Sequence, residues 1–171
     1  YYSNKIFIKK INLKSNKIKV KSKFIFISDI HLGTNSINHL NKIINKLKFL
    51  EYDFILIGGD LLDSSSYELN ELSVLKQITK PIYFVTGNHE YYLKNHIEKL
   101  DTLKNFNIIL LDNKRINIKD INLIGISDNQ LPNEQHNNYI KLRDNNNYNL
   151  LLIHKPSIWD KSKGNVDLML S

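Results

Sequence analysis

Several apolar stretches of this sequence end in side chains that can bind a metal ion. The stretch FIFI at 24–27 is followed by Asp29 and His31, a carboxylate and an imidazole two positions apart. Such oxygen and nitrogen ligands suit divalent transition metals, and two side chains at this spacing share one face of an extended chain. Three further apolar stretches lead to Asp60, to Asn88 with His89, and to His154. The pattern indicates metal-dependent chemistry if the fold brings these stretch ends together.

Each of these side chains also has a structural explanation. Asp29 could close a turn, Asp60 could cap the following segment, and His154 could be an ordinary hydrogen-bonded histidine. Asn88 could occupy a left-handed turn. For all four explanations to hold at four strand ends would be a coincidence. Glycines beside these ends let the chain bend sharply and approach an ion closely. We therefore favour the metal site.

Residues 24–104 have the pattern of alternating strands and helices. Apolar residues recur at helical spacing over 36–50, and capping-box residues at 65–68 open a second helix. Strands are expected at 24–28, 53–57 and 82–85, and a third helix at 92–104. Strand–helix–strand units form parallel sheets, and the carboxyl ends of parallel strands meet at one edge of the sheet. The predicted ligands stand at that edge.

The remaining residues predict mostly β-structure. Loose alternation over 4–23 predicts a two-stranded hairpin whose lysines face solvent. Short apolar runs at 108–111, 115–118 and 121–126 predict an antiparallel meander, and 148–153 and 166–170 predict two more strands. The asparagine-rich stretch 127–147 predicts a long loop with at most a short helix. From the residues alone, we expect a single doubly wound sheet with an antiparallel extension.

Length and composition limit the class of protein. The 171 residues fit a single domain, 1–171. The absence of cysteine excludes disulfides and thiolate clusters, so a metal would have oxygen and imidazole ligands. The formal charge of +7 favours anionic partners, namely phosphorylated metabolites, nucleic acid or an acidic membrane surface. Abundant lysine and asparagine could instead reflect a compositional bias along the whole chain.

The sequence sets only loose bounds on location. No apolar run approaches the roughly 20 residues of a transmembrane helix, and there is no signal-peptide pattern. We expect a protein that is cytoplasmic or peripheral at a membrane. The chain starts at Tyr1 without a methionine and stops at Ser171 directly after an apolar run, so we expect it to be part of a longer protein.

Four short motifs become specific when they are taken together. They are Asp29-Ile30-His31, Gly59-Asp60-Leu61-Leu62-Asp63, Gly87-Asn88-His89-Glu90 and the later His154. In order and approximate spacing, this series resembles the motifs of the calcineurin-like metallophosphoesterases over almost the whole chain. The resemblance implies an α/β fold in which a two-sheet β-sandwich is flanked by helices, with a two-metal centre between the loops. The meander at 108–126 would then belong to the second sheet.

The resemblance also implies a role for each motif residue. Asp29 and His31 would hold the first metal ion, Asp60 would bridge both ions, and Asn88 and His154 would hold the second. Manganese, iron and zinc suit such ligands about equally well. Two divalent ions about 4 Å apart can activate a shared hydroxide as nucleophile and neutralise the phosphoryl oxygens.

Three motif residues would act beside the metals. His89 would stabilise the transition state or protonate the leaving oxygen. Glu90 could orient that imidazole, and Asp63 could support it, although a role for Asp63 at a helix N-terminus is an equal alternative. The family's last motif, Gly-His-x-His, is absent and would follow Ser171 directly. We therefore expect residues 1–171 to bind divalent metal more weakly than the intact protein and to turn over phosphodiesters poorly or not at all.

The functional prediction is metal-dependent hydrolysis of a phosphomonoester, phosphodiester or pyrophosphate bond. The substrate would be a phosphorylated small molecule, a nucleotide or a lipid-linked compound, and the basic N-terminal hairpin suggests contact with an anionic membrane. A nuclease would fit the charge, but the sequence has no cluster of aromatic and basic residues. A non-catalytic scaffold would have lost metal ligands, yet every ligand position before Ser171 is filled.

Overall fold

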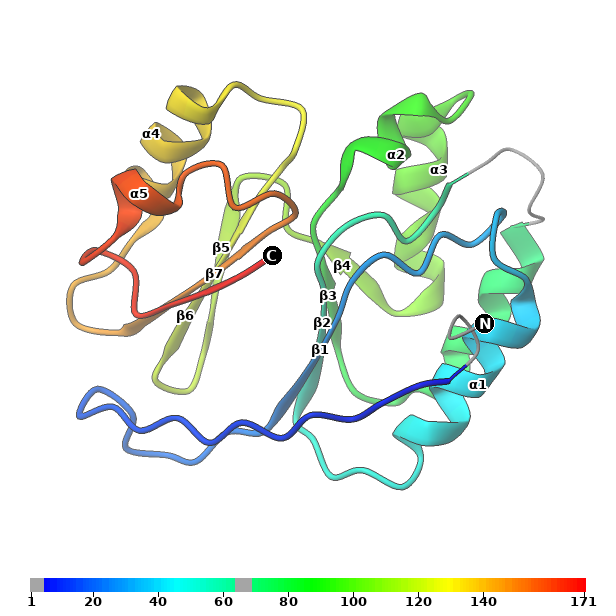
Figure 1. Ribbon diagram of the computed structural model, residues 1–171, viewed down its shortest axis with the longest axis horizontal. Coiled ribbons are helices and arrows are strands. Elements are labelled where there is room, and N and C mark those ends of the chain that lie inside the picture. Colours follow the sequence, from blue (N-terminus) through cyan, green and yellow to red (C-terminus); the bar gives the residue numbers. More distant parts are fainter. Residues whose placement is uncertain (1–4, 64–68) are drawn as a thin grey trace.

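The computed structural model describes residues 5–63 and 69–171, which form two four-stranded sheets packed face to face (Figure 1). The first sheet is parallel throughout, with the order β1-β2-β3-β4. In the second sheet, of order β5-β6-β7-β8, β5 and β6 are antiparallel and the other pairs are parallel. The strands are β1 (Phe24–Ile27), β2 (Phe54–Ile57), β3 (Ile82–Phe84), β4 (Ile108–Leu110), β5 (Lys114–Ile118), β6 (Ile121–Ile126), β7 (Tyr148–Ile153) and β8 (Leu168–Leu170).

Alternation along the strands divides the apolar side chains between two sides of the first sheet. In β2, Phe54 and Leu56 pack in a core between the sheets, whereas Ile55 and Ile57 pack in a core beneath the helices. Leu150 and Leu152 of β7 enter the same middle core from the second sheet. The two-sheet fold implied by the family motifs is thus confirmed, and the single doubly wound sheet expected from the residues alone is wrong.

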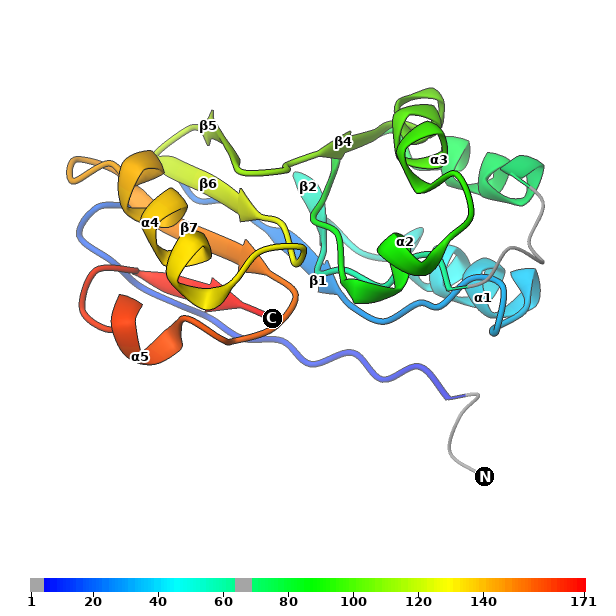
Figure 2. The same cartoon turned by 90° about the horizontal axis from the view of Figure 1, so that it is seen from above.

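Helices cover the outer face of each sheet (Figures 1 and 2). On the first sheet they include α1 (Ile37–Leu47), the 3₁₀ helix η1 (Leu69–Gln77), α3 (His96–Thr102) and the 3₁₀ helix η2 (Leu103–Phe106). On the second sheet they are α4 (Pro132–Leu142) and α5 (Trp159–Ser162). The short helix α2 (Asn88–Tyr92) begins directly after the loop that follows β3. The helix expected at 92–104 begins only at His96, as α3 followed by η2, and it is separated from α2 by a turn at 93–95 in which Asn95 has a left-handed backbone with a φ of 57°.

The predicted antiparallel meander is wrong in one of its three strands. Ile108–Leu110 pairs in parallel with β3 as the last strand of the first sheet, and only β5 and β6 form an antiparallel pair. The chain then crosses to the second sheet, where Gly125 lies against Leu111. A β-carbon on Gly125 would lie 2.3 Å from Leu111 Cβ, so the absence of a side chain permits this close approach.

The predicted long loop at 127–147 contains an 11-residue helix, α4. Pro132 stands in its first turn, and the Glu134 carboxylate accepts a hydrogen bond from the Leu131 backbone N–H at 3.1 Å. Tyr139 anchors the helix because its side chain is fully buried and its hydroxyl donates to Asn165 O at 2.5 Å. Burial raises the pKa of Tyr139 to about 12.

The N-terminal hairpin is also a wrong prediction, since no strand occurs in residues 5–23 of the described chain. The segment folds back at 16–17 in a turn closed by the hydrogen bond from Ile18 N–H to Ser15 O at 3.2 Å, and its later backbone groups bind other elements. The N–H groups of Lys19 and Val20 both donate to Asp120 Oδ2 at 2.8 Å. Ile6 packs against the helix-side core and Ile18 against the middle core. The capping box expected at 65–68 lies outside the described residues.

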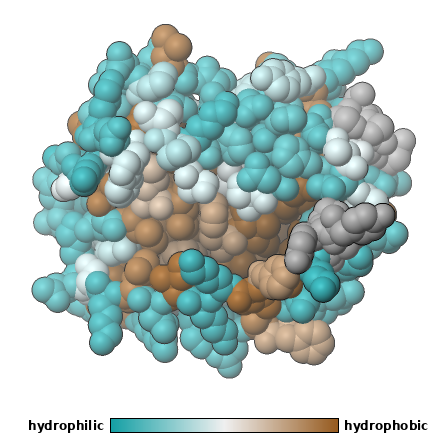
Figure 3. Space-filling view, in the orientation of Figure 1, coloured by the Kyte–Doolittle hydropathy of each residue, from teal (hydrophilic) through white to brown (hydrophobic). Residues whose placement is uncertain are grey.

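The open side of the sandwich exposes part of the middle core. The edge strands β1 and β8 are only partly buried, with Phe24, Phe26, Leu168 and Leu170 packed at the rim of that core. Figure 3 shows the apolar residues gathered in the hollow centre of this face. Among residues 5–63 and 69–171, no helix has the length and apolarity needed to cross a bilayer.

Candidate metal centre

The loops that carry the predicted ligands have unusual backbone conformations. Asp29, His31 and Asp60 have positive φ values of 57°, 49° and 51°. A left-handed backbone at a residue other than glycine costs roughly 1–3 kcal/mol and persists only where surrounding contacts hold it. Here Asp29 N–H donates to Gly59 O at 3.2 Å, and His31 N–H donates to Asp60 O at 2.8 Å. These backbone hydrogen bonds thus hold the loops after β1 and β2 against each other.

Three imidazoles converge on one oxygen of Asp60. His154 Nε2 lies 3.4 Å from Asp60 Oδ2, His31 Nε2 lies 3.7 Å away and His89 Nε2 lies 3.9 Å away. His31 Nε2 is also 3.7 Å from Asp29 Oδ1. Asp60 is buried, with 4% of its surface exposed. The ends of β1, β2, β3 and β7 therefore deliver their polar side chains to the same place.

His154 is oriented by the backbone. Its Nδ1 lies 2.8 Å from Gly58 O, and a carbonyl can only accept, so Nδ1 carries the proton. Its Nε2 is then left with a lone pair directed toward the Asp60 carboxylate. Metal-binding histidines are commonly oriented in this way by a hydrogen bond at the other ring nitrogen.

His89 is held by Asp63. The His89 Nδ1 and Asp63 Oδ1 atoms form a hydrogen bond, and the Thr34 hydroxyl donates to the other carboxylate oxygen. The hydrogen bond from Thr34 and those from His89 keep the pKa of Asp63 below its usual value, against the effect of burial. The side chain of His89 is 33% exposed, compared with 24% for His31 and 9% for His154. Among these three imidazoles, His89 is therefore the most accessible to a substrate.

Glu90 does not have the role expected for it. Its buried carboxylate accepts hydrogen bonds from the backbone N–H groups of Asp60, Leu62 and Gly87, at 3.1, 2.8 and 2.7 Å. Burial raises the pKa of Glu90, although these three donors act in the opposite direction. Glu90 joins the loop after β2 to the start of α2, and it is Asp63 that contacts the His89 ring.

Two glycines make room for the ligands. A β-carbon on Gly59 would lie 2.5 Å from His154 Nδ1, and one on Gly87 would lie 2.1 Å from Asp60 Oδ1. Gly59 also has a φ of +94°, which side chains rarely tolerate. The backbone at both positions is packed directly against a predicted ligand.

We expect Gly87→Ala to weaken manganese binding although it removes no predicted ligand. The new methyl group must displace the Asp60 carboxylate, and disturbing the support of a metal ligand commonly costs about 10–100-fold in affinity. Calorimetric titration with manganese measures this loss. Gly164→Ala is the control, because Gly164 has a φ of +83° but no atom lies within 4 Å of the position that its β-carbon would take. Equal affinities in both variants would contradict the role of Gly87.

The distances between these side chains suit the binding of divalent cations better than direct hydrogen bonds between the side chains. Separations of 3.4–3.9 Å between the imidazoles and Asp60 exceed good hydrogen bonds. Ligand atoms about 2.1 Å from one ion lie about 3–3.5 Å apart. Within the described chain, His31 Nδ1 is buried without a hydrogen-bond partner. Two groups have ligand atoms within 4.8 Å of one another: Asp29, Asp60 and His154, and His31, Asp63 and His89.

The predicted amide ligand lies at the start of a helix. Asn88 is the first residue of α2 and is partly buried, next to His89, whose N–H donates to Asp60 Oδ1 at 3.0 Å. Two supporting residues were missed from the sequence: Thr34, which binds Asp63, and Ser28, whose hydroxyl donates to Asp29 Oδ2. Neither belongs to a recognisable motif, so only the folded loops reveal them.

Comparison with known proteins agrees with this geometry. A family model described as calcineurin-like phosphoesterase matches residues 22–170. The chain belongs to the calcineurin-like phosphoesterase family. An uncharacterized metallophosphoesterase of Helicobacter pylori is 31% identical over 96% of this chain and 47% of its own length. A Bos taurus protein named "Transmembrane protein with metallophosphoesterase domain" is 35% identical over 56% of this chain and 22% of its own length.

Solved structures show the same fold at low sequence identity. The crystal structure of TT1561 of Thermus thermophilus has a TM-score of 0.56 and 9% identity, covering 87% of this phosphoesterase chain and 80% of its own. The chain spans about half or less of the length of the Helicobacter pylori and Bos taurus relatives. The family and fold are therefore established for residues 22–170.

Proposed function

We propose that this chain carries the metal centre of a hydrolase that cleaves phosphoester bonds with two divalent cations. The observation that supports this most is the convergence of imidazoles on the buried carboxylate of Asp60, 3.4–3.9 Å away. The family match over residues 22–170 points to the same chemistry. Manganese, iron and zinc all suit these oxygen and nitrogen ligands.

The proposed ligand assignment follows strand order. Asp29 and His31 would hold one cation, Asn88 and His154 would hold the other, and Asp60 would contribute to both. Asp60 suits this position because it lies within 4 Å of both His31 Nε2 and His154 Nε2. When bound, the cations supply positive charge against the phosphoryl oxygens and make the attacking water more acidic.

His89 is proposed as the catalytic acid rather than as a ligand. Its Nδ1 is occupied by Asp63, and its side chain is 33% exposed, so we assign the contact with the substrate to Nε2. Water oxygen bonds to phosphorus and loses one proton to the solvent, the bond to the leaving oxygen breaks, and His89 Nε2–H passes its proton to that leaving oxygen. The Asp63 carboxylate holds the ring and stabilises its protonated form, so Asp63 is a positioning residue.

The substrate class is proposed more broadly. A phosphomonoester, a phosphodiester or a pyrophosphate bond fits this chemistry, in a small-molecule, nucleotide or lipid-linked compound. We also propose that the basic N-terminal segment contacts an anionic membrane surface. The name of the Bos taurus relative, which contains "Transmembrane", supports a membrane setting.

Hydrolysis of bis-p-nitrophenyl phosphate with manganese tests the activity, on residues 1–171 and on the full-length gene product. We expect the release of nitrophenol to require the metal and to stop when a chelator is added. A full-length protein that binds manganese but releases no nitrophenol from this ester or from p-nitrophenyl phosphate would support a scaffold instead. Steeply salt-dependent cleavage of DNA would support a nuclease.

A further inference from the structure

The positive charge of this protein is concentrated in its N-terminal segment. Residues 1–23 contain eight lysines and no acidic residue, whereas residues 24–171 contain 16 lysines and arginines against 17 aspartates and glutamates. The net charge of +7 therefore comes entirely from the segment. A compositional bias spread along the chain would not produce this distribution.

Within this segment, residues 7–14 form a continuously exposed run with the sequence FIKKINLK. Its four large apolar side chains are among the most exposed of the described chain: Phe7 is 77% exposed, Ile8 49%, Ile11 66% and Leu13 58%. Both ribbon views show the dark blue segment running along the outside of the molecule (Figures 1 and 2). Exposed apolar side chains grouped in this way mark an interaction surface.

The exposed run is held at both ends. Before it, Ile6 packs against the helix-side core and lines a shallow pocket with Lys42, Lys46 and the 88%-exposed Phe49. After it, Lys17 Nζ forms an ion pair with Asp167 Oδ2 at 2.9 Å. The Lys19 and Val20 N–H groups then bind Asp120. These anchors present residues 7–14 at the surface rather than leaving them as a free tail.

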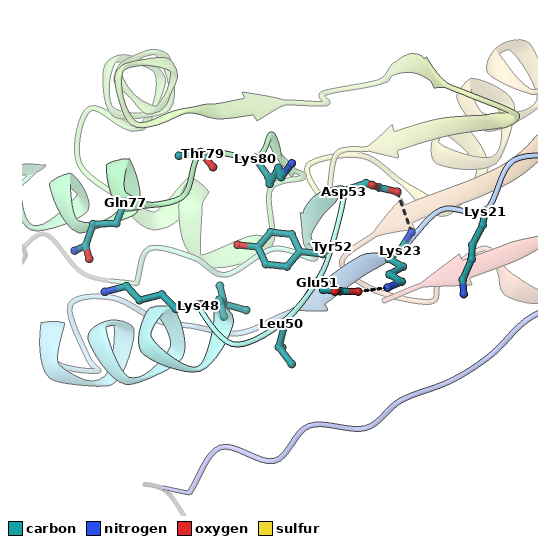
Figure 4. A pocket seen from close by; sticks show the side chains of 11 residues that line it. Lys21, Lys23, Lys48, Leu50, Glu51, Tyr52, Asp53, Gln77, Thr79 and Lys80 are labelled. Atoms are coloured by element: carbon teal, nitrogen blue, oxygen red, sulfur yellow. Dashed lines mark hydrogen bonds and ion pairs between the residues drawn. The ribbon is translucent and has the colours of Figure 1, made fainter.

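A basic cavity extends the charged surface beside the run (Figure 4). Its volume is about 580 Å³, and Lys21, Lys23, Lys48 and Lys80 line it. Glu51 and Asp53 line it as well, and the hydrogen bond from Lys23 together with the charges of Lys23, Lys21 and Lys10 lowers the pKa of Glu51. Lys10 of the exposed run thus adds to the positive charge around this cavity.

We propose that residues 7–14 dock this protein on an anionic membrane surface, with the apolar side chains in the interface and the lysines at the lipid headgroups. Alternating apolar and lysine side chains without any acid suit such a surface, where each lysine contributes about a fivefold factor in partitioning. A surface that binds single-stranded nucleic acid offers several aromatic side chains on which bases stack, and Phe7 is the only aromatic residue in the run. This proposal rests on the membrane contact proposed above and is independent of hydrolysis.

Docking through this face also determines which way the metal centre faces relative to the membrane. The segment lies beneath the amino-terminal ends of the strands, whereas the metal centre follows the carboxyl-terminal ends of β1, β2 and β7 (Figure 1). The docked protein therefore keeps the metal centre open to the aqueous phase. This arrangement favours a water-soluble phosphoester over the headgroup of a lipid in the same patch of membrane.

Co-sedimentation with phosphatidylcholine vesicles, with and without phosphatidylglycerol, tests the docking. We expect binding only to the vesicles that contain phosphatidylglycerol. The triple variant Lys9→Glu, Lys10→Glu and Lys14→Glu should lower partitioning by about 100-fold or more. The triple variant Phe7→Ser, Ile11→Ser and Leu13→Ser, which keeps the charge, should lower it by about tenfold or more.

The matched control carries the same charge change elsewhere, in Lys94→Glu, Lys141→Glu and Lys163→Glu, which alter exposed lysines outside the segment. Equal loss in this control, equal binding to neutral vesicles, or binding to DNA or an acidic protein in preference to lipid would overturn the proposal. Manganese titration of the same variants distinguishes the membrane-docking proposal from the metal-centre proposal. Metal binding should be unchanged in them, whereas a failure of metal binding in protein that still binds vesicles would count against the metal centre alone.

Discussion

His89→Ala should lower the rate of phosphodiester hydrolysis by about 10²–10⁴-fold, the usual contribution of a general acid, while manganese affinity stays within a few-fold of the original. The reason is that His89 Nε2 lies at the open side of the centre, 3.9 Å from Asp60, and its other nitrogen is already bound to Asp63. Rates with bis-p-nitrophenyl phosphate and calorimetric titration measure the two effects on the full-length protein.

The Asp63→Asn variant provides the matched comparison. Asparagine keeps the shape of the side chain but removes the charge that stabilises a protonated His89, so the rate should fall less than in His89→Ala. The double variant should be no slower than His89→Ala alone, because Asp63 acts only through that ring. Additive losses would place Asp63 in a separate role, and a large loss of manganese affinity in His89→Ala would make His89 a ligand.

The strands of the site were predictable because each is short, apolar and followed by a polar turn. The expected strand 148–153 matches β7, Tyr148–Ile153, and β2 differs from its prediction by one residue. What the residues could not decide was which strands pair. Ile108–Leu110 resembles the neighbouring strands in sequence, yet it pairs with β3. The apolar pattern of a strand does not specify which sheet edge the strand joins.

Two further errors have a common physical origin. In residues 5–23, Ile6 and Ile18 pack against two different cores, whereas Ile8, Ile11 and Leu13 of the same alternation are exposed. In α4, the polar sequence hides a helix that one fully buried residue, Tyr139, holds against the second sheet. Periodicity alone therefore indicated neither the exposure of residues 7–14 nor the burial of Tyr139.

The polar side chains at the strand ends were predictable from their positions, but their mutual support was not. Glu90 was expected to orient the His89 imidazole, and Asp63 either to support the site or to lie at a helix N-terminus. The choice depends on the direction of each carboxylate: Glu90 faces three backbone N–H groups, and Asp63 faces the imidazole. The positive φ angles at Asp29, His31 and Asp60 were likewise invisible in the sequence, since none of these residues is a glycine.

Asp60→Asn should reduce manganese affinity by more than about 100-fold, beyond the 10–100-fold typical of residues that only support a ligand. Asparagine is a well-matched replacement, because it tolerates a φ of 51° and can still accept the His89 N–H hydrogen bond. It removes the negative charge and puts an NH2 group, which cannot bind a cation, in place of the oxygen that faces the imidazoles. Asp101→Asn, at an exposed ion pair with Lys104, is the control.

The same substitution should leave the metal-free protein as stable as before, or make it more stable. Asp60 is buried and its charge lies close enough to Glu90 to help raise the pKa of that second carboxyl, so without a cation the two charges repel. Thermal unfolding with and without manganese measures both effects: the original protein should gain stability from the metal and Asp60→Asn should not. A metal-free variant that unfolds, or one that still binds manganese tightly, would show that Asp60 is a structural residue, because a carboxylate kept for metal binding stabilises the fold only when the metal is present.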